Sequence, residues 1–427
     1  MARRLLKEST VCGNILLHFF EDGDTMKTLI ELYDRNPIYN YLASLVFRPE
    51  KVVFVGAVNE PIEKCRAKTL KFAQLMDIES EFEFVYSRPN DYEDNCRTIR
   101  SVIEKEKLNG NDCFIDVTGG RDLALVAAGS FVGENAEIIY YDRAQNRYLN
   151  LVSGESVEFD AKIPCEAFIT MAGGTVFEVA RSHKCSPDEE KMIADITELF
   201  FEMRKEWTGF VKYLQQVAKK DENDPSLFVD APVKFTDNGK TFECNKEIMH
   251  GLEKLGAIRN IRFNDKRVNF SFASHYVGNL LVNEGVWLEL KVYLTAKEMP
   301  CFSDSQTGVK FVWDIPCGDR SLSKLLSDTV PRNEVDAVLS RGLTPVFISC
   351  KTRAPFNEDL NELYAIKEKF GGDFARAIIV TTKKVGRDTP IYERAQALGI
   401  GIIDEKTFEN GNLAEKLDIL TERRRKK

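Results

Sequence analysis

Short apolar runs alternate with longer segments of helical periodicity through the N-terminal part of the chain. The runs predict strands, and the segments whose apolar residues recur every three or four positions predict helices. This alternation implies a parallel sheet with helices on both faces. We therefore predict an α/β, Rossmann-like domain over residues 1–165. Its predicted strands are 14–20, 51–56, 81–86, 113–117 and 136–141, and its predicted helices are 26–46, 60–76, 92–107 and the segment between the last two strands.

The pattern changes over residues 166–279, where two amphipathic helices are followed by a polar breaker, a short helix and a hairpin. Helices followed by a β-hairpin are typical of a small winged-helix module, which we predict here. The predicted helices are 188–204, 207–219 and 245–255, and the predicted hairpin is 259–272.

Residues 280–427 return to alternating strands and helices and predict a second α/β domain. Three domains agree with a length of 427 residues. The predicted helices of this domain are 280–297, 357–370 and 389–398, and its predicted strands are 309–314, 334–340, 345–349, 375–381 and 400–404.

Composition and charge exclude several classes of protein. Hydrophobic residues make up 43% of the chain and charged residues 30%, so it can bury several cores. No apolar stretch reaches the roughly 18 residues of a membrane span, and no signal peptide is visible. The ten cysteines stand singly without a CxxC pair, which favours reduced thiols over a zinc site or a disulfide framework. We expect a cytoplasmic protein without a membrane partner, and its net charge of −8 argues against a polybasic nucleic-acid coat.

A glycine-rich turn follows the predicted strand at 113–117. Thr118, Gly119 and Gly120 precede Arg121 and Asp122, where a helix begins. Glycines allow a ligand to approach the backbone, the helix start offers free N–H groups, and a guanidinium suits phosphate. The turn lies beyond the C-terminal end of a parallel strand, where α/β sheets bind ligands. The same residues are also compatible with an ordinary tight turn.

The loop after the first predicted strand is acidic and contains Asp22, Gly23 and Asp24. A dinucleotide fold carries GxGxxG at this place, so a pyrophosphate is not expected here. The carboxylates can instead accept hydrogen bonds from ribose hydroxyls or an adenine amino group. No GxxxxGK[ST] motif occurs, which excludes a P-loop ATPase.

Charged residues interrupt the apolar segments of the C-terminal domain. Glu289 lies within a predicted helix, Asp336 lies within a strand two residues after Glu334, and Lys351 follows the next strand. Carboxylates can hold a divalent cation that activates water, and a lysine can orient that water or stabilise developing charge. Oxygen ligands favour Mg²⁺ or Mn²⁺ over zinc. The alternative is that these are strand-end charges facing solvent.

In this order, these residues resemble the PD-(D/E)xK restriction-endonuclease-like superfamily. Together with the D-V-T-G-G-R turn and the predicted winged helix, nearly the whole chain resembles the CRISPR ancillary nucleases of the Card and Can type. The N-terminal part of those nucleases is a CARF (CRISPR-associated Rossmann fold) domain.

The resemblance implies a homodimer of type III CRISPR antiviral defence that is activated by cyclic oligoadenylate, most commonly cyclic tetra-adenylate. The activated nuclease would cleave single-stranded RNA or DNA, with nicking of duplex DNA as a further activity. Glu289, Asp336 and the backbone carbonyl of Cys350 would bind Mn²⁺ or Mg²⁺, and Lys351 would act on the water or the phosphate. The cyclic ligand would contact Asp22, Gly23, Asp24, Thr118, Gly119, Gly120, Arg121 and Asp122.

The chain departs from the family pattern at Ser349, where (D/E)xK has an acid. Glu334, on the same strand face as Asp336, or Glu362, on the following helix, would have to supply the missing charge. Two alternatives therefore stay open. One is a ligand-responsive regulator that binds duplex DNA through its winged helix and has an inactive nuclease domain. The other is a repair or restriction nuclease with an unrelated nucleotide effector.

Overall fold

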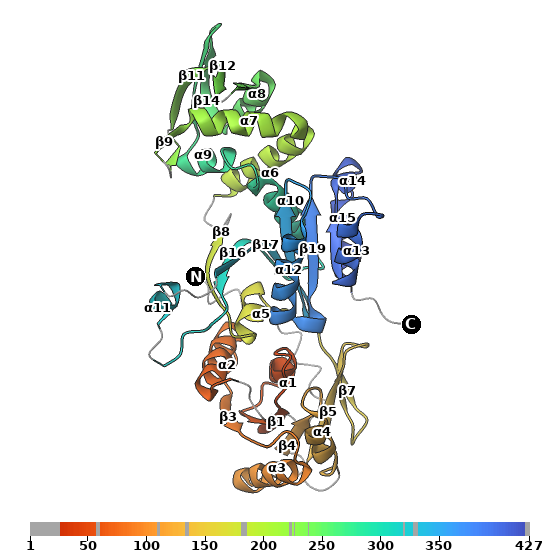
Figure 1. The fold of residues 1–427 in the computed structure, drawn as a ribbon. Helices are drawn as coiled ribbons and strands as arrows, with labels where there is room; N and C mark the ends of the chain where they lie inside the picture. Colours follow the sequence, from red (N-terminus) through yellow and green to blue (C-terminus); the bar gives the residue numbers. More distant parts are fainter. Residues whose placement is uncertain are drawn as a thin grey trace.

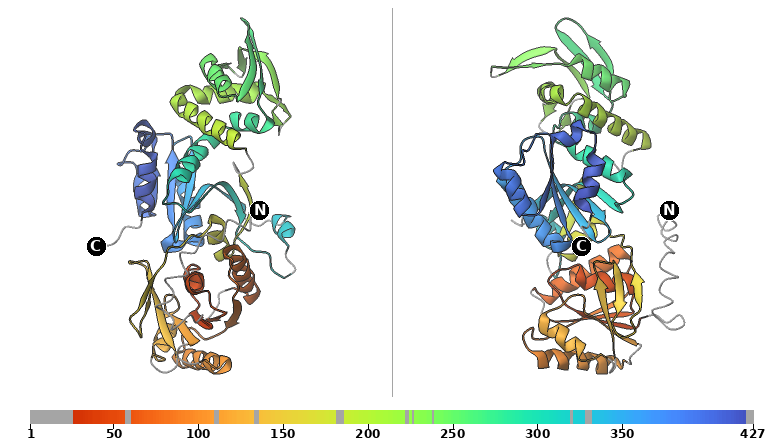
Figure 2. Two further views of the ribbon diagram at one scale, coloured as in Figure 1. Left: turned by 180° about the vertical axis from the view of Figure 1, so that it is seen from behind. Right: turned by 90° about the vertical axis from the view of Figure 1, so that its right-hand side faces the viewer.

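A computed structural model shows three bodies one after another, with the C-terminal domain between the N-terminal domain and the middle module (Figures 1 and 2). No helix in the part of the chain that is described is long and apolar enough to cross a membrane. The structure describes residues 26–56, 60–108, 112–132, 136–180, 186–221, 224–225, 227–237, 239–318, 321–327 and 332–422.

The N-terminal domain is a seven-stranded sheet in the order β3-β2-β1-β4-β5-β6-β7. Strands β1 to β5 are parallel, whereas β6 and β7 add an antiparallel edge. Helices α1 and α2 pack on one face, and α3 and α4 pack on the other, which confirms the Rossmann-like prediction. The strands are β1 Thr28–Leu32, β2 Lys51–Val55, β3 Glu81–Val85, β4 Cys113–Asp116, β5 Glu137–Asp142, β6 Arg147–Asn150 and β7 Ser156–Glu158, and the helices are α1 Tyr39–Phe47, α2 Ile62–Met76, α3 Tyr92–Glu106 and α4 Asp122–Gly129.

The helix predicted over 26–46 is wrong, because this segment contains the central strand β1, a loop and α1. All five residues of β1 are buried, since the strand is covered on both faces and therefore lacks the alternation of a half-exposed strand. The strand predicted at 14–20 lies outside the described residues. The short antiparallel strands β6 and β7 were not predicted.

The middle module has a winged-helix-like arrangement, in which α7 and α8 pack against a three-stranded sheet in the order β11-β15-β14. A capping box between Ser186 and Glu189 starts α6, and Trp207 lies at the centre of the core. The elements are α6 Pro187–Glu202, α7 Arg204–Val217, β9 Lys219–Asp221, β10 Asp224–Pro225, β11 Phe228–Pro232, β12 Lys234–Asp237, β13 Lys240–Glu243, α8 Lys246–Lys254, β14 Ile258–Phe263, β15 Arg267–Phe272 and α9 His275–Leu281.

The C-terminal domain is a six-stranded sheet in the order β20-β19-β18-β17-β16-β8. Helices α12 and α13 cover one face, and α10 and α15 cover the other. The strands are β8 Thr175–Ala180, β16 Asp304–Val312, β17 Arg332–Arg341, β18 Thr344–Lys351, β19 Arg376–Thr381 and β20 Ile400–Ile403, and the helices are α5 Cys165–Met171, α10 Val286–Glu298, α11 Leu322–Ser327, α12 Asn357–Phe370, the 3₁₀ turn η5 Gly372–Phe374, α13 Pro390–Ala397, α14 Glu405–Glu409 and α15 Leu413–Thr421.

Two features differ from the sequence-based expectation for this region. Strand β8 falls within the range predicted for the middle module, yet it pairs with β16 at the edge of the C-terminal sheet. The helix predicted over 280–297 is divided into α9 and α10, because the Gly285 N–H donates to Asn283 Oδ1 (3.0 Å) in an intervening turn. The boundaries at 165 and 279 stay predictions.

Candidate functional site

The glycine turn of the N-terminal domain is held by hydrogen bonds at the end of β4. The Thr118 N–H donates to Asp116 Oδ1 (2.7 Å), and Thr118 Oγ1 accepts from the Tyr141 N–H (2.8 Å). The Gly120 N–H donates to Asp34 Oδ2 (2.9 Å). The turn is therefore fixed to β5 on one side and to the loop after β1 on the other.

Both glycines are required by packing within the domain. A Cβ on Gly119 would lie 2.8 Å from the Cβ of Asp34 and 3.0 Å from that of Tyr39. Gly120 has φ +105°, and its Cβ would lie 2.7 Å from the Cβ of Leu32. Packing in a tight turn is therefore sufficient to explain why both positions are glycine, without a ligand. Ligand binding would depend on the backbone N–H groups and on Arg121 and Asp122 at the start of α4.

The loop after β1 was missed by the sequence analysis. Because β1 is Thr28–Leu32, this loop contains Asp34 and Asn36, whereas Asp22, Gly23 and Asp24 lie outside the described residues. Asp34 accepts the Asn36 N–H (2.7 Å) as well as the N–H of Gly120. A polar segment with Pro37 just before a helical pattern was the available signal.

A buried carboxyl group lies beneath this turn. Glu31 on β1 is fully buried next to Asp116 on β4, and in the described structure its carboxylate oxygens have no hydrogen-bond partner. Burial raises the pKa of Glu31 well above its usual range, and the charge of Asp116 raises it further. Burial also raises the pKa of Asp116 to about 6, although Thr118 and Tyr148 donate hydrogen bonds to it. Burial therefore favours the protonated form of Glu31.

We expect Glu31→Gln to stabilise the protein at pH 8 more than at pH 5. The unfolded chain loses the Glu31 proton above pH ~4, whereas the folded protein retains it to a higher pH, so wild-type stability decreases by up to about 1.4 kcal/mol per pH unit between the unfolded and the folded pKa. The amide has no proton to lose. Thermal unfolding at both pH values measures the difference, with the exposed Glu79→Gln as the matched control. An effect that is the same at both pH values would contradict the assignment.

The edge of the N-terminal sheet that carries the turn contacts the C-terminal domain. Arg143, after β5, donates to the backbone carbonyl of Asp373 (2.6 Å), and its guanidinium lies 4.0 Å from the ring centre of Phe374. Tyr39, which adjoins Gly119, packs edge-to-face on the same ring at 5.2 Å. Lys64 on α2 forms an ion pair with Asp314 (2.7 Å). A single side chain, that of Tyr39, therefore connects the glycine turn with Phe374 of η5, the 3₁₀ turn that follows α12.

In the C-terminal domain, the β17–β18 hairpin opens where the predicted residues stand. Its ladder ends at the pair Ala337–Ile348. Beyond that pair, Asp336 Oδ2 accepts the Cys350 N–H (2.6 Å) and the hydroxyl of Ser349 (3.3 Å). The Lys351 Nζ lies 3.8 Å from the same oxygen. The structure thus brings Asp336, Ser349, Cys350 and Lys351 together.

A cavity of about 40 Å³ adjoins this group, which is enough for a small ion with a few water molecules. Glu334 enters it from β17 and Glu362 from α12, so both candidates for the missing acid lie beside Asp336. Glu362 also accepts a hydrogen bond from the Asn333 amide (3.4 Å). The residues that line the cavity are Glu334, Val335, Asp336, Ser349, Lys351, Asp359, Glu362, Leu363 and Ile366.

Glu289 faces this site from α10. Burial raises its pKa to about 8, and the charges of Asp336 and Glu334 contribute, while Lys351 opposes them. Burial raises the pKa of Asp336 as well. Crowded carboxyl groups of this kind suit a hard divalent cation, which would replace the protons. Within the described residues, however, no three acidic, histidine or cysteine side chains already surround one point as a metal cage.

The comparisons with known proteins support the fold. No family model and no curated protein matches the sequence. Among solved structures, protein VC1899 from Vibrio cholerae is 17% identical with a TM-score of 0.71, covering 92% of this chain and 97% of its own. Can2 from Sulfobacillus thermosulfidooxidans, in complex with cyclic tetra-adenylate, is 17% identical with a TM-score of 0.65, covering 93% and 100%.

A third structure is a type III CRISPR defence DNA nuclease activated by cyclic oligoadenylate. It is 16% identical with a TM-score of 0.50, and the match covers 85% of this chain but 46% of that longer protein. These likenesses agree with the three bodies described above. The chain therefore shares the overall fold of VC1899 and Can2, with a Rossmann-like domain, a winged-helix-like module and a second α/β domain.

Proposed function

We propose that this protein is a metal-dependent nuclease of type III CRISPR antiviral defence that cyclic oligoadenylate activates. The observation that carries the proposal is the cluster of Asp336, Ser349 and Lys351 at the open end of the β17–β18 hairpin. The similarity to Can2 with its bound cyclic tetra-adenylate supports this cyclic nucleotide, called the ring below, as the activator. The substrate would be single-stranded RNA or DNA, with duplex DNA nicked in addition, and the protein would act in the cytoplasm.

The clustered residues of the C-terminal domain would have distinct roles in cleavage. Asp336 and Glu289, with the carbonyl of Cys350, would hold Mn²⁺ or Mg²⁺. When bound, the cation would lower the pKa of a water molecule and neutralise charge on the phosphate. Lys351 would orient that water or stabilise the developing negative charge. Ser349 cannot supply the missing charge, but its hydroxyl holds the Asp336 carboxylate in place, and Glu334 or Glu362 would complete the ligand set.

The ring would bind at the glycine turn. The N–H groups at the start of α4 and the Arg121 guanidinium can donate hydrogen bonds to its phosphates. The proposed contact residues at this turn are Thr118, Gly119, Gly120, Arg121 and Asp122. Whether Asp22, Gly23 and Asp24 take part is tested by their substitution. A ligand that displaces Gly119 would also displace Tyr39, which packs on Phe374.

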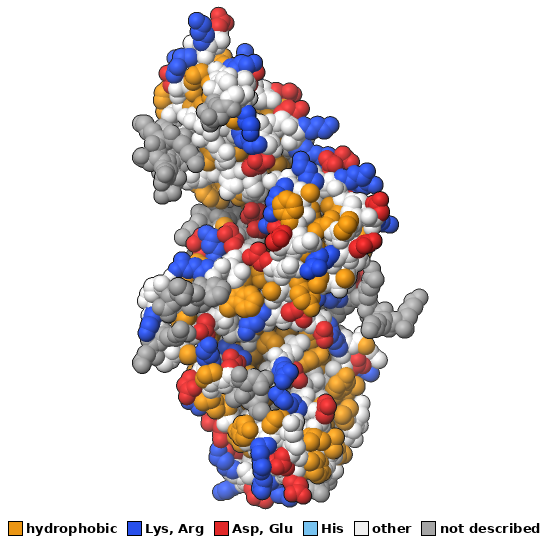
Figure 3. Space-filling view, in the orientation of Figure 1, with side chains coloured by type: hydrophobic (Ala, Val, Ile, Leu, Met, Phe, Trp, Pro, Cys, Tyr) orange, Lys and Arg blue, Asp and Glu red, His pale blue; other side chains and the backbone are white. Residues whose placement is uncertain are grey.

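An exposed apolar patch on the N-terminal domain supports the homodimer. Hydrophobic side chains gather over α4 and β5–β7, at the lower right of the molecule (Figure 3). Val126 on α4 is 59% exposed and Leu151 is 52% exposed. Because α4 starts directly after Arg121, a second copy packed on this patch would place its own turn beside the first, which suits a symmetric ring. The patch consists of Leu123, Val126, Val132, Tyr140, Leu151 and Val152.

The proposal is tested by cleavage of labelled single-stranded RNA, single-stranded DNA and supercoiled plasmid. We expect cleavage only when both cyclic tetra-adenylate and Mn²⁺ or Mg²⁺ are present, and calorimetry should give one ring per two chains. Omitting the ring or adding EDTA should each stop the reaction.

Ring binding without cleavage under any condition would contradict the nuclease and favour the regulator. The specific observation behind that second candidate is the neutral Ser349 in the acid's position. A ring-dependent mobility shift of duplex DNA without strand breakage would identify it.

A further inference from the structure

The solvent side of the three-stranded sheet in the middle module carries a group of polar residues, which we call the outer sheet face. On β15 it presents Asn269 and Ser271 between the buried side chains of Val268, Phe270 and Phe272. Neighbouring strands contribute arginines and one acid to the same side. The outer sheet face consists of Asp230, Arg259, Arg262, Arg267, Asn269 and Ser271.

A β-bulge in β14 places two arginines on this face together. Arg259 pairs with Ser271, and Arg262 pairs with Asn269, so two β14 residues oppose the single residue Phe270. Asn260, within the bulge, has φ +59°. In a regular strand, residues three positions apart point to opposite faces, whereas the extra residue of a bulge restores them to the same face. The bulge therefore concentrates positive charge on the outer sheet face.

That charge is not neutralised on the surface. Arg267 is paired with Asp230 (3.0 Å), the one acid of the outer sheet face. Arg259 and Arg262 are exposed and form no ion pair with any residue that the structure describes. Two exposed arginines with nearby amide and hydroxyl groups fit a phosphodiester backbone.

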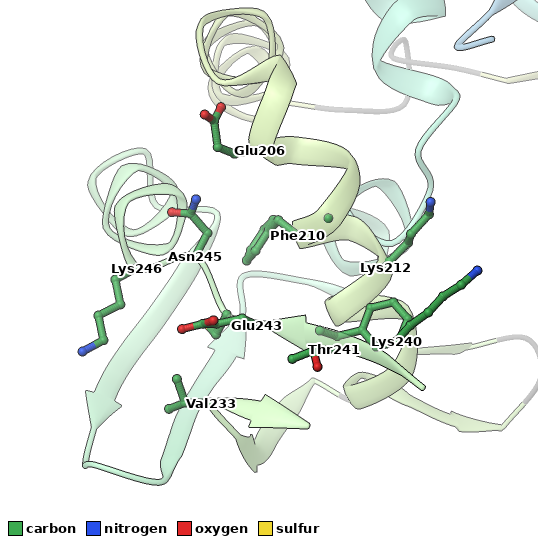
Figure 4. Close-up of a pocket in the computed structure, with 12 residues that line it drawn as sticks. Glu206, Phe210, Lys212, Val233, Lys240, Thr241, Glu243, Asn245 and Lys246 are labelled. Carbon is green, nitrogen blue, oxygen red and sulfur yellow. The ribbon is translucent and has the colours of Figure 1, made fainter. Parts of the chain in front are cut away.

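Other surfaces of the module have mixed charge. The exposed Lys246 and Lys254 of α8 are accompanied by Glu247 and Glu253. A groove of about 840 Å³ between α7, β13 and the start of α8 shares no residue with the outer sheet face (Figure 4). This groove carries glutamates among its lysines, as its polar lining shows: Glu206, Lys212, Lys240, Thr241, Glu243, Asn245 and Lys246.

We propose that the outer sheet face binds single-stranded nucleic acid, namely the strand that the nuclease site cuts; this rests on the proposed function. Arg259 and Arg262 bind phosphates, and Asn269 and Ser271 donate to sugars or bases. The ring of Phe228, 58% exposed on the same side of β11, offers a surface for base stacking. A sheet face with an exposed ring suits unstacked bases better than a duplex.

The test is binding of fluorescent oligo(dT) and oligo(U) to the full-length protein with Asp336→Ala, which keeps the strand intact. Adding Arg259→Ala and Arg262→Ala should lower the slope of log K against log salt by about 1.4, because each single-strand phosphate contributes about 0.7. At 0.1 M salt this corresponds to binding about 25-fold weaker. The control is Arg66→Ala with Lys71→Ala, two exposed cations of α2, which should change neither value.

Unchanged binding of both oligonucleotides in the double variant, or no binding by the parent protein, would overturn the proposal. With a fluorescent DNA duplex as a third probe, loss of duplex binding alone would overturn it too, because the face would then bind duplex DNA. The nuclease function is judged separately, by ring-dependent cleavage with the native Asp336. If the double variant binds more weakly but the protein with native Asp336 does not cleave, the outer sheet face is retained as a binding site and the nuclease function is rejected. If that protein cleaves but the double variant binds as before, the nuclease function is retained and the outer sheet face is rejected.

Discussion

Asp336→Ala is expected to abolish metal-dependent cleavage while leaving binding of the cyclic ligand unchanged. One oxygen of Asp336 lies next to the Cys350 N–H, the Ser349 hydroxyl and the Lys351 ammonium, so its removal would take away both the proposed metal ligand and the group that positions these three. The loss should be on the order of 10³-fold or more in the cleavage rate. Initial rates at saturating ring and Mn²⁺, with calorimetry of ring binding, measure both parts.

The exposed Asp388→Ala is the matched control for this change and should cleave normally. Because removal of a half-buried carboxylate can also disturb the hairpin, Asp336→Asn should be tested in parallel, since the amide keeps the shape without the charge. Full activity of either Asp336 variant would show that the metal site lies elsewhere.

Arg143→Ala is expected to uncouple ring binding in the N-terminal domain from cleavage in the C-terminal domain. Arg143 donates to the Asp373 carbonyl and stacks over Phe374, directly after the helix that carries Glu362. Without this contact, the glycine turn would still reach Phe374 through Tyr39, but without the hydrogen bond to the Asp373 carbonyl. We expect ring-stimulated cleavage to fall by about 5- to 150-fold, the usual range of coupling between two sites, with a much smaller change in ring affinity.

The control for Arg143 is Arg100→Ala, because Arg100 makes a similar contact over Phe131 entirely within the N-terminal domain. Stimulation should be retained there. If Arg143→Ala were stimulated as fully as the wild type, the contact with Phe374 would be structural only. A parallel loss of ring binding would instead place Arg143 in the ligand site.

Elements with a clear local pattern could be predicted from the sequence. Strand β4 and its glycine turn, helix α3 and the β17–β18 hairpin all follow from residue spacing, because each is amphipathic or bounded by turn residues. Strand β1 could not be recognised, since burial on both faces removes the alternation that distinguishes a half-exposed strand. Because β1 was not recognised, the loop after the first predicted strand was placed at residues 22–24, and the loop that contains Asp34 was not considered.

Features that depend on long-range packing could not be predicted. The grouping of Asp336 with Lys351 follows from a local hairpin, but the approach of Glu289 depends on how α10 packs on the sheet. The contact between Arg143 and Asp373 joins residues 230 positions apart, and no local pattern encodes it. The state of Glu31 depends likewise on the neighbour that β4 brings beside it.

Strand β8 makes the middle module an insertion within the C-terminal domain. The chain forms the edge of the C-terminal sheet at Thr175–Ala180, leaves it to build the winged-helix-like module, and returns through α10 to complete the sheet. A fragment that starts at residue 280 would therefore leave the edge of β16 unpaired and open to aggregation. Exchange of the module for another would instead keep the sheet whole, but the new module would have to cover Trp287 of α10, which packs against Trp207 in the core of the present one.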